Sequence, residues 1–135
     1  MSKKERDFID KFKERVYQKY RKTFFYKIPD GFRTGSKPFD VILDNGKTHY
    51  LEFKWLEANR KSFKVSSIFQ SHQIRLLNQL FNNKFKNYMC AWGVIKVGKD
   101  TFLLPACDLQ NERINLSEFK KFSLDEVVNY LCNND

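Results

Sequence analysis

The hydrophobic positions near the start of the chain recur at helical spacing, and Lys and Arg fill the faces between them. The hydrophobic positions are Phe8, Ile9, Phe12, Val16 and Tyr20. A stripe of this kind is typical of a helix that packs one face on a core. We therefore predict a helix from about Lys4 to Lys22. At the other end of the chain, Ser123-Leu124-Asp125-Glu126 forms a capping box, which predicts a helix from Ser123 to about Cys132.

Strand patterns follow the first helix. The aromatic segment from Thr23 to Ile28 is interrupted by Pro29-Asp30-Gly31, which predicts a strand and a break. Two further strands, Phe39 to Leu43 and Thr48 to Trp55, are joined by Asp44-Asn45-Gly46. An Asn-Gly pair between two such runs predicts a β-hairpin.

The second half of the chain alternates in the same way. We expect a polar, basic loop from Glu57 to Ser67 and a helix from Ile68 to Asn82. A buried strand from Tyr88 to Val97 turns at Gly98-Lys99-Asp100 into a second strand, Thr101 to Leu104. Helices and strands in this order predict a mixed α/β fold around a central sheet. Because no linker, repeat or low-complexity segment divides the chain, we assign residues 1–135 to a single domain.

The turn of the predicted hairpin decides which side chains share a face. A two-residue loop, Asn45-Gly46, would place Asp40 and Glu52 on opposite faces of the sheet. A three-residue loop, Asp44-Asn45-Gly46, with Gly46 in the left-handed position of a bulge, places them on the same face.

The three-residue loop is favoured because it sorts the two strands into one apolar and one polar face. It pairs Leu43 with Lys47 and sets Asp40 opposite Tyr50 and diagonal to Glu52. The apolar face then carries Phe39, Val41, Leu43, Leu51, Phe53 and Trp55. The polar face carries Asp40, Thr48, Tyr50, Glu52 and Lys54, with Ile42 as its one aliphatic misfit.

Composition narrows the class of partner. The chain has 135 residues and a net charge of +9, which suits a polyanion such as nucleic acid; a generally basic proteome would give the same excess. The N-terminus lacks an apolar signal segment, and no apolar run is long enough to span a bilayer. We expect an intracellular, cytoplasmic protein, associated with a nucleoid or with viral replication. Cys90, Cys107 and Cys132 lack zinc-site spacing, so we expect reduced thiols.

The hairpin carries the strongest chemical signal. Glu52 and Lys54 are two residues apart on a strand, so both side chains point to one face. With Asp40 on that face, two carboxylates and the backbone carbonyl of Phe53 make an oxygen site for a hard cation such as Mg²⁺. Lys54 can then orient water or stabilise charge on a phosphate. The alternative is that Lys54 only neutralises two acids on a surface hairpin.

A third acid is expected from the first helix. Glu5 lies on the apolar stripe that faces the core, whereas Glu14 lies on the opposite, solvated face. We therefore favour Glu5 as the helix-borne ligand. Its alternative role is that of an acid that stabilises the helix N-terminus.

These residues resemble the PD-(D/E)xK nuclease motif, with Asp40 as its aspartate and Glu52-Phe53-Lys54 as its second half. Within that superfamily the chain resembles Holliday-junction resolvases of the Hjc and RecU types, over roughly Glu5 to Leu109. The segments that carry this finer resemblance are Glu5-Arg6-Asp7-Phe8-Ile9, Gly35-Ser36-Lys37, Ser62-Phe63, His72-Gln73-Ile74 and Phe102-Leu103-Leu104-Pro105-Ala106. The long stalk that RecU carries before its aspartate has no counterpart here.

The resemblance implies a restriction-endonuclease-like core with a central mixed sheet flanked by helices. It implies that Asp40, Glu52 and Glu5 bind Mg²⁺, for which Mn²⁺ can substitute, and that Lys54 is the catalytic lysine. Ser36 would contact phosphate or the groups around the metal ligands, and Gln73 or Gln70 would reach the site from the second helix; both glutamines could equally belong to a polar helix face.

The expected substrate is branched DNA, most of all a four-way junction. Basic side chains beside the site, in polar segments, are candidates for phosphate contacts: Arg33, Lys37, Arg60, Lys61 and Lys64. Paired nicks imply a homodimer, with Phe24, Phe25 and Tyr26 or the last helix as candidate surfaces. Two rival hypotheses stay open, namely a nuclease of the same fold with another DNA substrate, and a DNA-binding module without catalysis.

Overall fold

The computed structural model describes residues 2–30, 37–82 and 90–133. Its first helix, α1 (Lys3–Lys19), begins at Ser2, whose hydroxyl and backbone form a capping box with Glu5. The helix buries Phe8, Ile9, Phe12 and Val16, which confirms the predicted stripe. It ends three residues before the predicted Lys22, with Tyr20 as its C-cap.

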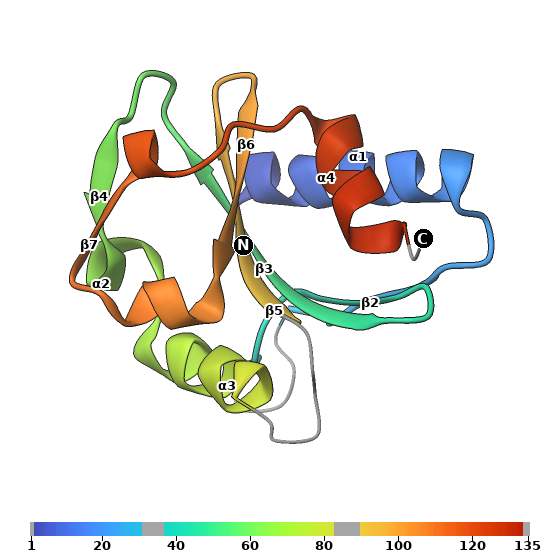
Figure 1. The fold of residues 1–135 in the computed structure, drawn as a ribbon, viewed down its shortest axis with the longest axis horizontal. Coiled ribbons are helices and arrows are strands. Elements are labelled where there is room, and N and C mark those ends of the chain that lie inside the picture. Colours follow the sequence, from blue (N-terminus) through green and yellow to red (C-terminus); the bar gives the residue numbers. More distant parts are fainter. Residues whose placement is uncertain (1, 31–36, 83–89, 134–135) are drawn as a thin grey trace.

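The centre of the molecule is a five-stranded sheet in the order β1-β2-β3-β5-β6 (Figure 1). Its strands are β1 (Phe24–Lys27), β2 (Val41–Asp44), β3 (Thr48–Leu56), β5 (Ala91–Val97) and β6 (Asp100–Pro105). The β3–β5 pair is parallel and the other three pairs are antiparallel. The sheet is therefore mixed, as predicted, and its longest strand, β3, lies in the middle.

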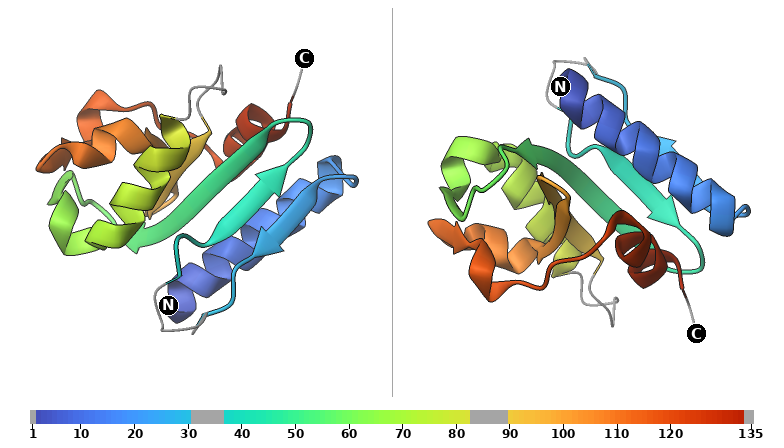
Figure 2. Two further views of the ribbon diagram at one scale, coloured as in Figure 1. Left: turned by 90° about the horizontal axis from the view of Figure 1, so that it is seen from below. Right: turned by 90° about the horizontal axis from the view of Figure 1, so that it is seen from above.

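Each face of the sheet carries its own hydrophobic core. On one face, α1 and α4 (Leu124–Cys132) pack over a cluster that includes Phe12, Leu43 and Phe53. On the other, α2 (Val65–Ile68) and α3 (Ser71–Phe81) pack over a cluster that includes Phe69. The helices seen on opposite sides of the strands in Figures 1 and 2 belong to these two layers. Because both faces are covered at its centre, β3 is buried over most of its length.

The β2–β3 hairpin has a three-residue loop, as predicted, but the loop is one residue further along. Asp44 pairs with Thr48, so the loop is Asn45-Gly46-Lys47 rather than Asp44-Asn45-Gly46. Gly46 has a φ of 97°, a region that suits glycine. Moving both ends of the loop by one residue keeps the parity of the register, and Asp40 and Glu52 remain on one face.

The polar face of the hairpin is less polar than predicted. Ile42 and Tyr50 are directly paired and are both half-buried against the second core, together with the buried Phe39. The alternation predicts Phe39 on the opposite face, but this residue lies before β2 begins at Val41 and is not held by the strand. The aliphatic misfit at Ile42 is thus explained by a second core on that face.

The segment predicted as a loop from Glu57 to Ser67 is partly ordered. It contains β4 (Ser62–Lys64), which pairs with β7 (Arg113–Asn115) in a separate two-stranded sheet. The predicted helix from Ile68 to Asn82 is divided, because α2 ends at Ile68 and α3 starts at Ser71. Two short 3₁₀ helices, η1 (Ala106–Gln110) and η2 (Leu116–Glu118), flank β7.

The last helix begins at Ser123 with the predicted capping box to Glu126. Cys90 and Cys132 are buried and Cys107 is exposed, and the described structure has all three as thiols rather than as disulfides. Within the described ranges no helix is both long and apolar enough to cross a membrane.

Candidate active site

The predicted site forms on the inner part of β3. Glu52 is 2% exposed, and its Oε2 accepts from the ammonium of Lys54 at 3.1 Å. Both side chains lie on the face that carries the second core, because β3 alternates strictly and its odd-numbered residues pack under α1. A buried carboxylate and a mostly buried ammonium are costly to desolvate. The sheet therefore holds two ionisable side chains at a position that packing alone would fill with apolar side chains.

Asp40 joins this pair because its carboxylate takes the place of a backbone hydrogen-bond acceptor in the sheet. The regular β2–β3 ladder stops at Val41, and the next N–H on that side of β3, the one of Phe53, donates to Asp40 Oδ2 at 2.8 Å. The backbone N–H of Asp40 in turn donates to Leu51 O at 3.0 Å. Asp40 is 1% exposed, so its carboxylate is fixed against β3 beside Glu52.

The two acids are electrostatically linked. Burial raises the pKa of Glu52 to about 8, with a further contribution from the negative charge of Asp40, and Lys54 acts in the opposite direction. Among the described residues, Glu52 Oε1 is buried and has no hydrogen-bond partner. Two close carboxyls with an unsatisfied buried oxygen form a site that gains from a cation.

An aromatic ring excludes water from this charged group. Gly93 of β5 pairs with Glu52 across the sheet, and a Cβ added at Gly93 would lie 3.0 Å from Cζ of Phe69. Glycine therefore lets the Phe69 ring lie directly on the sheet next to Glu52. The ammonium of Lys54 lies 5.6 Å from the centroid of the same ring, within the range of a cation–π contact. The sequence alone points to neither Gly93 nor Phe69.

Lys37 lies inside the site rather than on its rim. Its ammonium is 2.7 Å from Asp40 Oδ1 and 2.7 Å from Asp30 Oδ1, and its side chain is 13% exposed. Burial lowers the pKa of Lys37, but its hydrogen bonds and ion pairs with these two acids outweigh burial and raise it. The position predicted for a phosphate contact is thus filled by a lysine that neutralises Asp40.

The oxygen atoms available as metal ligands suit a hard divalent cation. Asp40 and Glu52 offer carboxylate oxygens, and the carbonyl of Phe53 points to the same side of β3 as its N–H, toward Asp40. Oxygen ligands of this kind are those that Mg²⁺ and Mn²⁺ prefer. Over the described parts of the chain, no cluster of three or more His, Cys, Asp or Glu residues has the geometry of a metal site. Two acids and a carbonyl are therefore the set that the fold brings together.

The helix-borne acid is placed at the start of α1. Glu5 is half-buried and its Oε1 accepts from the backbone N–H and the hydroxyl of Ser2, at 3.3 and 3.1 Å. This is the helix-stabilising role given as its alternative. Glu14 is exposed and accepts from Gln18, in line with its predicted solvated position. Whether Glu5 also serves a cation stays a prediction.

The two glutamines differ in environment. Gln73 is 4% exposed, and its Oε1 has no hydrogen-bond partner among the described residues, so it does not lie on a polar helix face. Gln70 is exposed and is the N-cap residue of α3, without a side-chain cap. Arg60, Lys61 and Lys64 are all exposed. The predicted Arg33 and Ser36 lie outside the described residues.

The comparisons with known proteins found a likeness in structure. No family model matches the chain, and the curated proteins contain no significant match to it. Its fold matches the structure of Archaeoglobus fulgidus Hjc, a Holliday junction resolvase from an archaeal hyperthermophile, with a TM-score of 0.58. The match covers 96% of this chain and 98% of that one at 15% identity. The chain therefore has the mixed α/β fold of that resolvase.

Proposed function

We propose that the chain is a metal-dependent nuclease that hydrolyses phosphodiester bonds in branched DNA, most of all in four-way junctions. The observation that carries the proposal is the pair of buried acids Asp40 and Glu52 beside Lys54, with an unpartnered oxygen on Glu52 among the described residues. The PD-(D/E)xK pattern of these residues and the fold shared with an archaeal resolvase support it. The net charge of +9 suits a DNA substrate.

Each residue of the site has a proposed role that follows from its chemistry. Asp40, Glu52 and the Phe53 carbonyl would hold Mg²⁺, or Mn²⁺ in its place. The bound cation would stabilise negative charge on the phosphate and lower the pKa of nearby water. Glu5 is the proposed additional acid for this site.

Lys54 acts as a cation whose position is fixed. Its contacts with Glu52 and with the ring of Phe69 hold the ammonium on the site face, where it can stabilise charge that develops on the phosphate and orient the attacking water. Phe69 excludes water from around Lys54 and Glu52, which strengthens these electrostatic effects. We place Gln73 as a hydrogen-bonding residue near the same site, because a buried amide oxygen needs a donor.

The deciding experiment is cleavage of a labelled immobile four-way junction beside a linear duplex of the same sequence, each with Mg²⁺ and with EDTA. We expect paired nicks in opposing strands of the junction, only with metal. The matched control is Asp40→Asn, which removes one negative charge and is expected to abolish cleavage while junction binding persists.

The other outcomes separate the rival functions. Equal cutting of junction and duplex would keep the nuclease and reject the junction preference. Binding without cutting in Mg²⁺ or Mn²⁺ would favour a non-catalytic DNA-binding module. Full activity of Asp40→Asn would refute the assignment of the site.

A homodimer is part of the proposal, because symmetric nicking needs two sites. The exposed aromatic side chains of the edge strand β1, Phe24 and Tyr26, are 57% and 47% exposed and stack with centroids 6.4 Å apart. Phe25, predicted with them, is buried under α1 and is excluded. Tyr26 aligns with Ile42 on β2, on the face of β1 and β2 that no helix covers in Figure 2. We propose that a second copy covers this strip.

Sedimentation at micromolar concentration tests the dimer. Wild type is expected to sediment as a dimer and Tyr26→Ser as a folded monomer, because the substitution removes apolar area only from the exposed face. Tyr130→Ser is the control, since Tyr130 is also exposed, at 57% against 47% for Tyr26, but lies on α4. A monomeric wild type, or loss of the dimer in the control alone, would reject this surface.

A further inference from the structure

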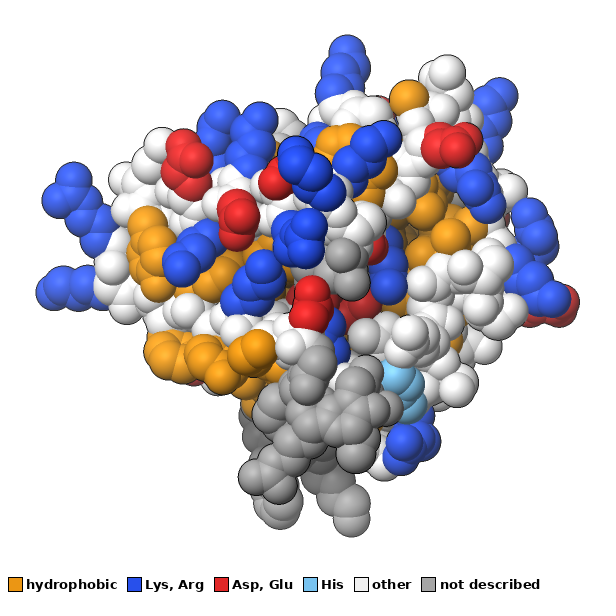
Figure 3. Space-filling view, turned by 180° about the vertical axis from the view of Figure 1, so that it is seen from behind, with side chains coloured by type: hydrophobic (Ala, Val, Ile, Leu, Met, Phe, Trp, Pro, Cys, Tyr) orange, Lys and Arg blue, Asp and Glu red, His pale blue; other side chains and the backbone are white. Residues whose placement is uncertain are grey.

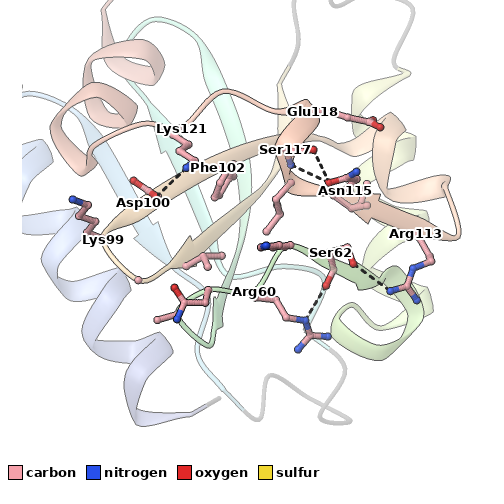
Figure 4. Close-up of a pocket in the computed structure, with 17 residues that line it drawn as sticks. Arg60, Ser62, Lys99, Asp100, Phe102, Arg113, Asn115, Ser117, Glu118 and Lys121 are labelled. Atoms are coloured by element: carbon pink, nitrogen blue, oxygen red, sulfur yellow. Dashed lines mark hydrogen bonds and ion pairs between the residues drawn. The ribbon is translucent and has the colours of Figure 1, made fainter.

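A second charged feature lies beyond the end of the site strand. A groove with a volume of about 1070 Å³ opens between the β5–β6 turn and the small sheet of β4 and β7 (Figure 4). Its floor includes the buried Phe102 and Leu116. None of the proposed catalytic residues lines this groove.

The rim of the groove is rich in cations that come from separate elements. Lys99 stands on the β5–β6 turn, Arg60 and Lys61 precede β4, and Arg113 begins β7. Within the described residues, none of these four forms an ion pair with a carboxylate. The only described cation of the rim that does so is Lys121, 3.9 Å from Asp100.

Hydrogen bonds to Ser62 of β4 hold both arginines that line the groove. Arg60 donates through Nε to Ser62 O at 2.8 Å, and Arg113 donates to Ser62 Oγ at 3.4 Å, contacts that Figure 4 shows as dashed lines. Each guanidinium keeps further N–H groups for a ligand. Two acids also line the groove, Glu118 and Asp100.

The arrangement fits an extended polyanion better than a small anion. A small-ligand site needs buried polar groups that converge on one point, whereas these cations are exposed and spread along the rim. Lys and Arg side chains are also numerous on the face shown in Figure 3, with acidic side chains scattered among them. Spread, exposed cations are the usual means of holding a phosphate backbone without reading bases.

The groove lies toward the end of β3, on the face of the sheet that carries the proposed site. Leu56 lies two residues after Lys54 on β3, about 7 Å along the strand, and pairs with Val97, which lines the groove. Val97 and Phe102 belong to the same core as Phe69, which touches Lys54.

We propose that this groove is a second DNA-binding site, which holds the phosphate backbone of a duplex arm next to the scissile phosphate through Arg60, Lys61, Lys99 and Arg113. The inference rests on the proposed function in taking DNA as the ligand. It adds Lys99 and Arg113 to the DNA-contacting residues, and it predicts that the groove raises affinity without taking part in hydrolysis.

The test is DNA binding in EDTA as a function of salt, with Asp40→Asn as the background so that no cleavage occurs. The probe is a labelled four-way junction, with a linear duplex alongside. Lys99→Gln with Arg113→Gln is compared with Arg21→Gln and Lys22→Gln. Both pairs remove one exposed lysine and one exposed arginine, but the control pair follows α1 at the far end of the molecule from β4 and β7 (Figure 1).

We expect the groove pair to weaken binding roughly tenfold at ~100 mM salt and to reduce the slope of log K against log salt by about 2, because each cation that no longer neutralises a phosphate lowers the slope by close to one. Glu118→Gln should strengthen binding, because it removes the opposing charge. The control pair should change neither quantity appreciably. Circular dichroism would establish that all variants are folded.

Equal losses of affinity from the two pairs would overturn the proposal, because net charge alone would then explain them. An unchanged salt slope in the groove pair would also overturn it. Failure of the nuclease proposal is seen separately, as absent cleavage by the protein with Asp40 intact. In that protein the groove pair is expected to raise KM and leave kcat unchanged.

Discussion

Replacing Glu52 with glutamine is expected to stabilise the metal-free protein at neutral and alkaline pH while removing its proposed activity. The pKa of Glu52 is raised from 4.5 to about 8, first by burial and then by the charge of Asp40. The folded protein therefore keeps a proton on this group that the unfolded chain releases. Glutamine has nearly the same shape and never ionises, so the variant avoids the cost of a buried charge.

The sign and size of this effect on the free energy of unfolding follow from proton linkage. Between pH 4.5 and about 8, the folded state binds one more proton at Glu52 than the unfolded state does. The free energy of unfolding of wild type therefore falls by about 1.4 kcal/mol for each pH unit in this window and levels off above it. Summed over the window, the contribution of this group is about 3–5 kcal/mol.

The assay is urea unfolding of wild type and Glu52→Gln in EDTA, at several pH values on both sides of the window. The difference between the two proteins should be small near pH 4.5, grow up to about pH 8 and then stay constant. Adding Mg²⁺ should stabilise wild type most at the alkaline end and leave the variant nearly unchanged, because a cation favours the ionised carboxylate. Parallel stability curves for the two proteins would refute the reasoning.

Substitutions at three positions test the surroundings of the site. Asp40→Ala should cost about 1–3 kcal/mol of stability because the buried N–H of Phe53 loses its acceptor, and Asp40→Asn should cost less; urea unfolding compares them. Lys37→Met should lower the melting temperature in EDTA, with a larger gain on adding Mg²⁺ than wild type shows, because Asp40 then lacks its cation. Gly93→Ala should displace the ring of Phe69 and cost about 1–3 kcal/mol, with near-ultraviolet circular dichroism reporting the ring; an unchanged spectrum and stability would contradict the close contact.

The placement of the acids was predictable from the hairpin because only the parity of its register matters. The predicted loop lies one residue too early, but Asp40 and Glu52 still fall on one face, since moving both loop ends restores the alternation. The exact residue pairing between the two strands was not predictable, because Asn45-Gly46 fits either version of a three-residue loop. Gly46 takes the positive φ in the structure.

Features that depend on distant segments were not predictable from local patterns. Phe63 and Ile114 alternate with polar neighbours, but each strand has only three residues, and the pairing between the two strands joins segments that are far apart in the sequence. Lys37 has the local pattern of an exposed lysine, because its two acidic partners, Asp30 and Asp40, lie on either side of it at separations without a regular period. Gly93 has no visible role until the fold places Phe69 over it.

The contact between Asp40 and the Phe53 N–H has a consequence for how this site can change over evolutionary time. A side chain that stands in for a backbone acceptor is kept by the stability of the sheet as well as by catalysis. A descendant that lost its activity through Glu52 or Lys54 would still be under pressure to retain Asp or Asn at position 40. The aspartate is then the last member of the motif to disappear, and Glu52, whose charge destabilises the fold, is the first to be replaced once selection for activity ends. In chains of this fold, a retained glutamate is therefore the better sign of a working site.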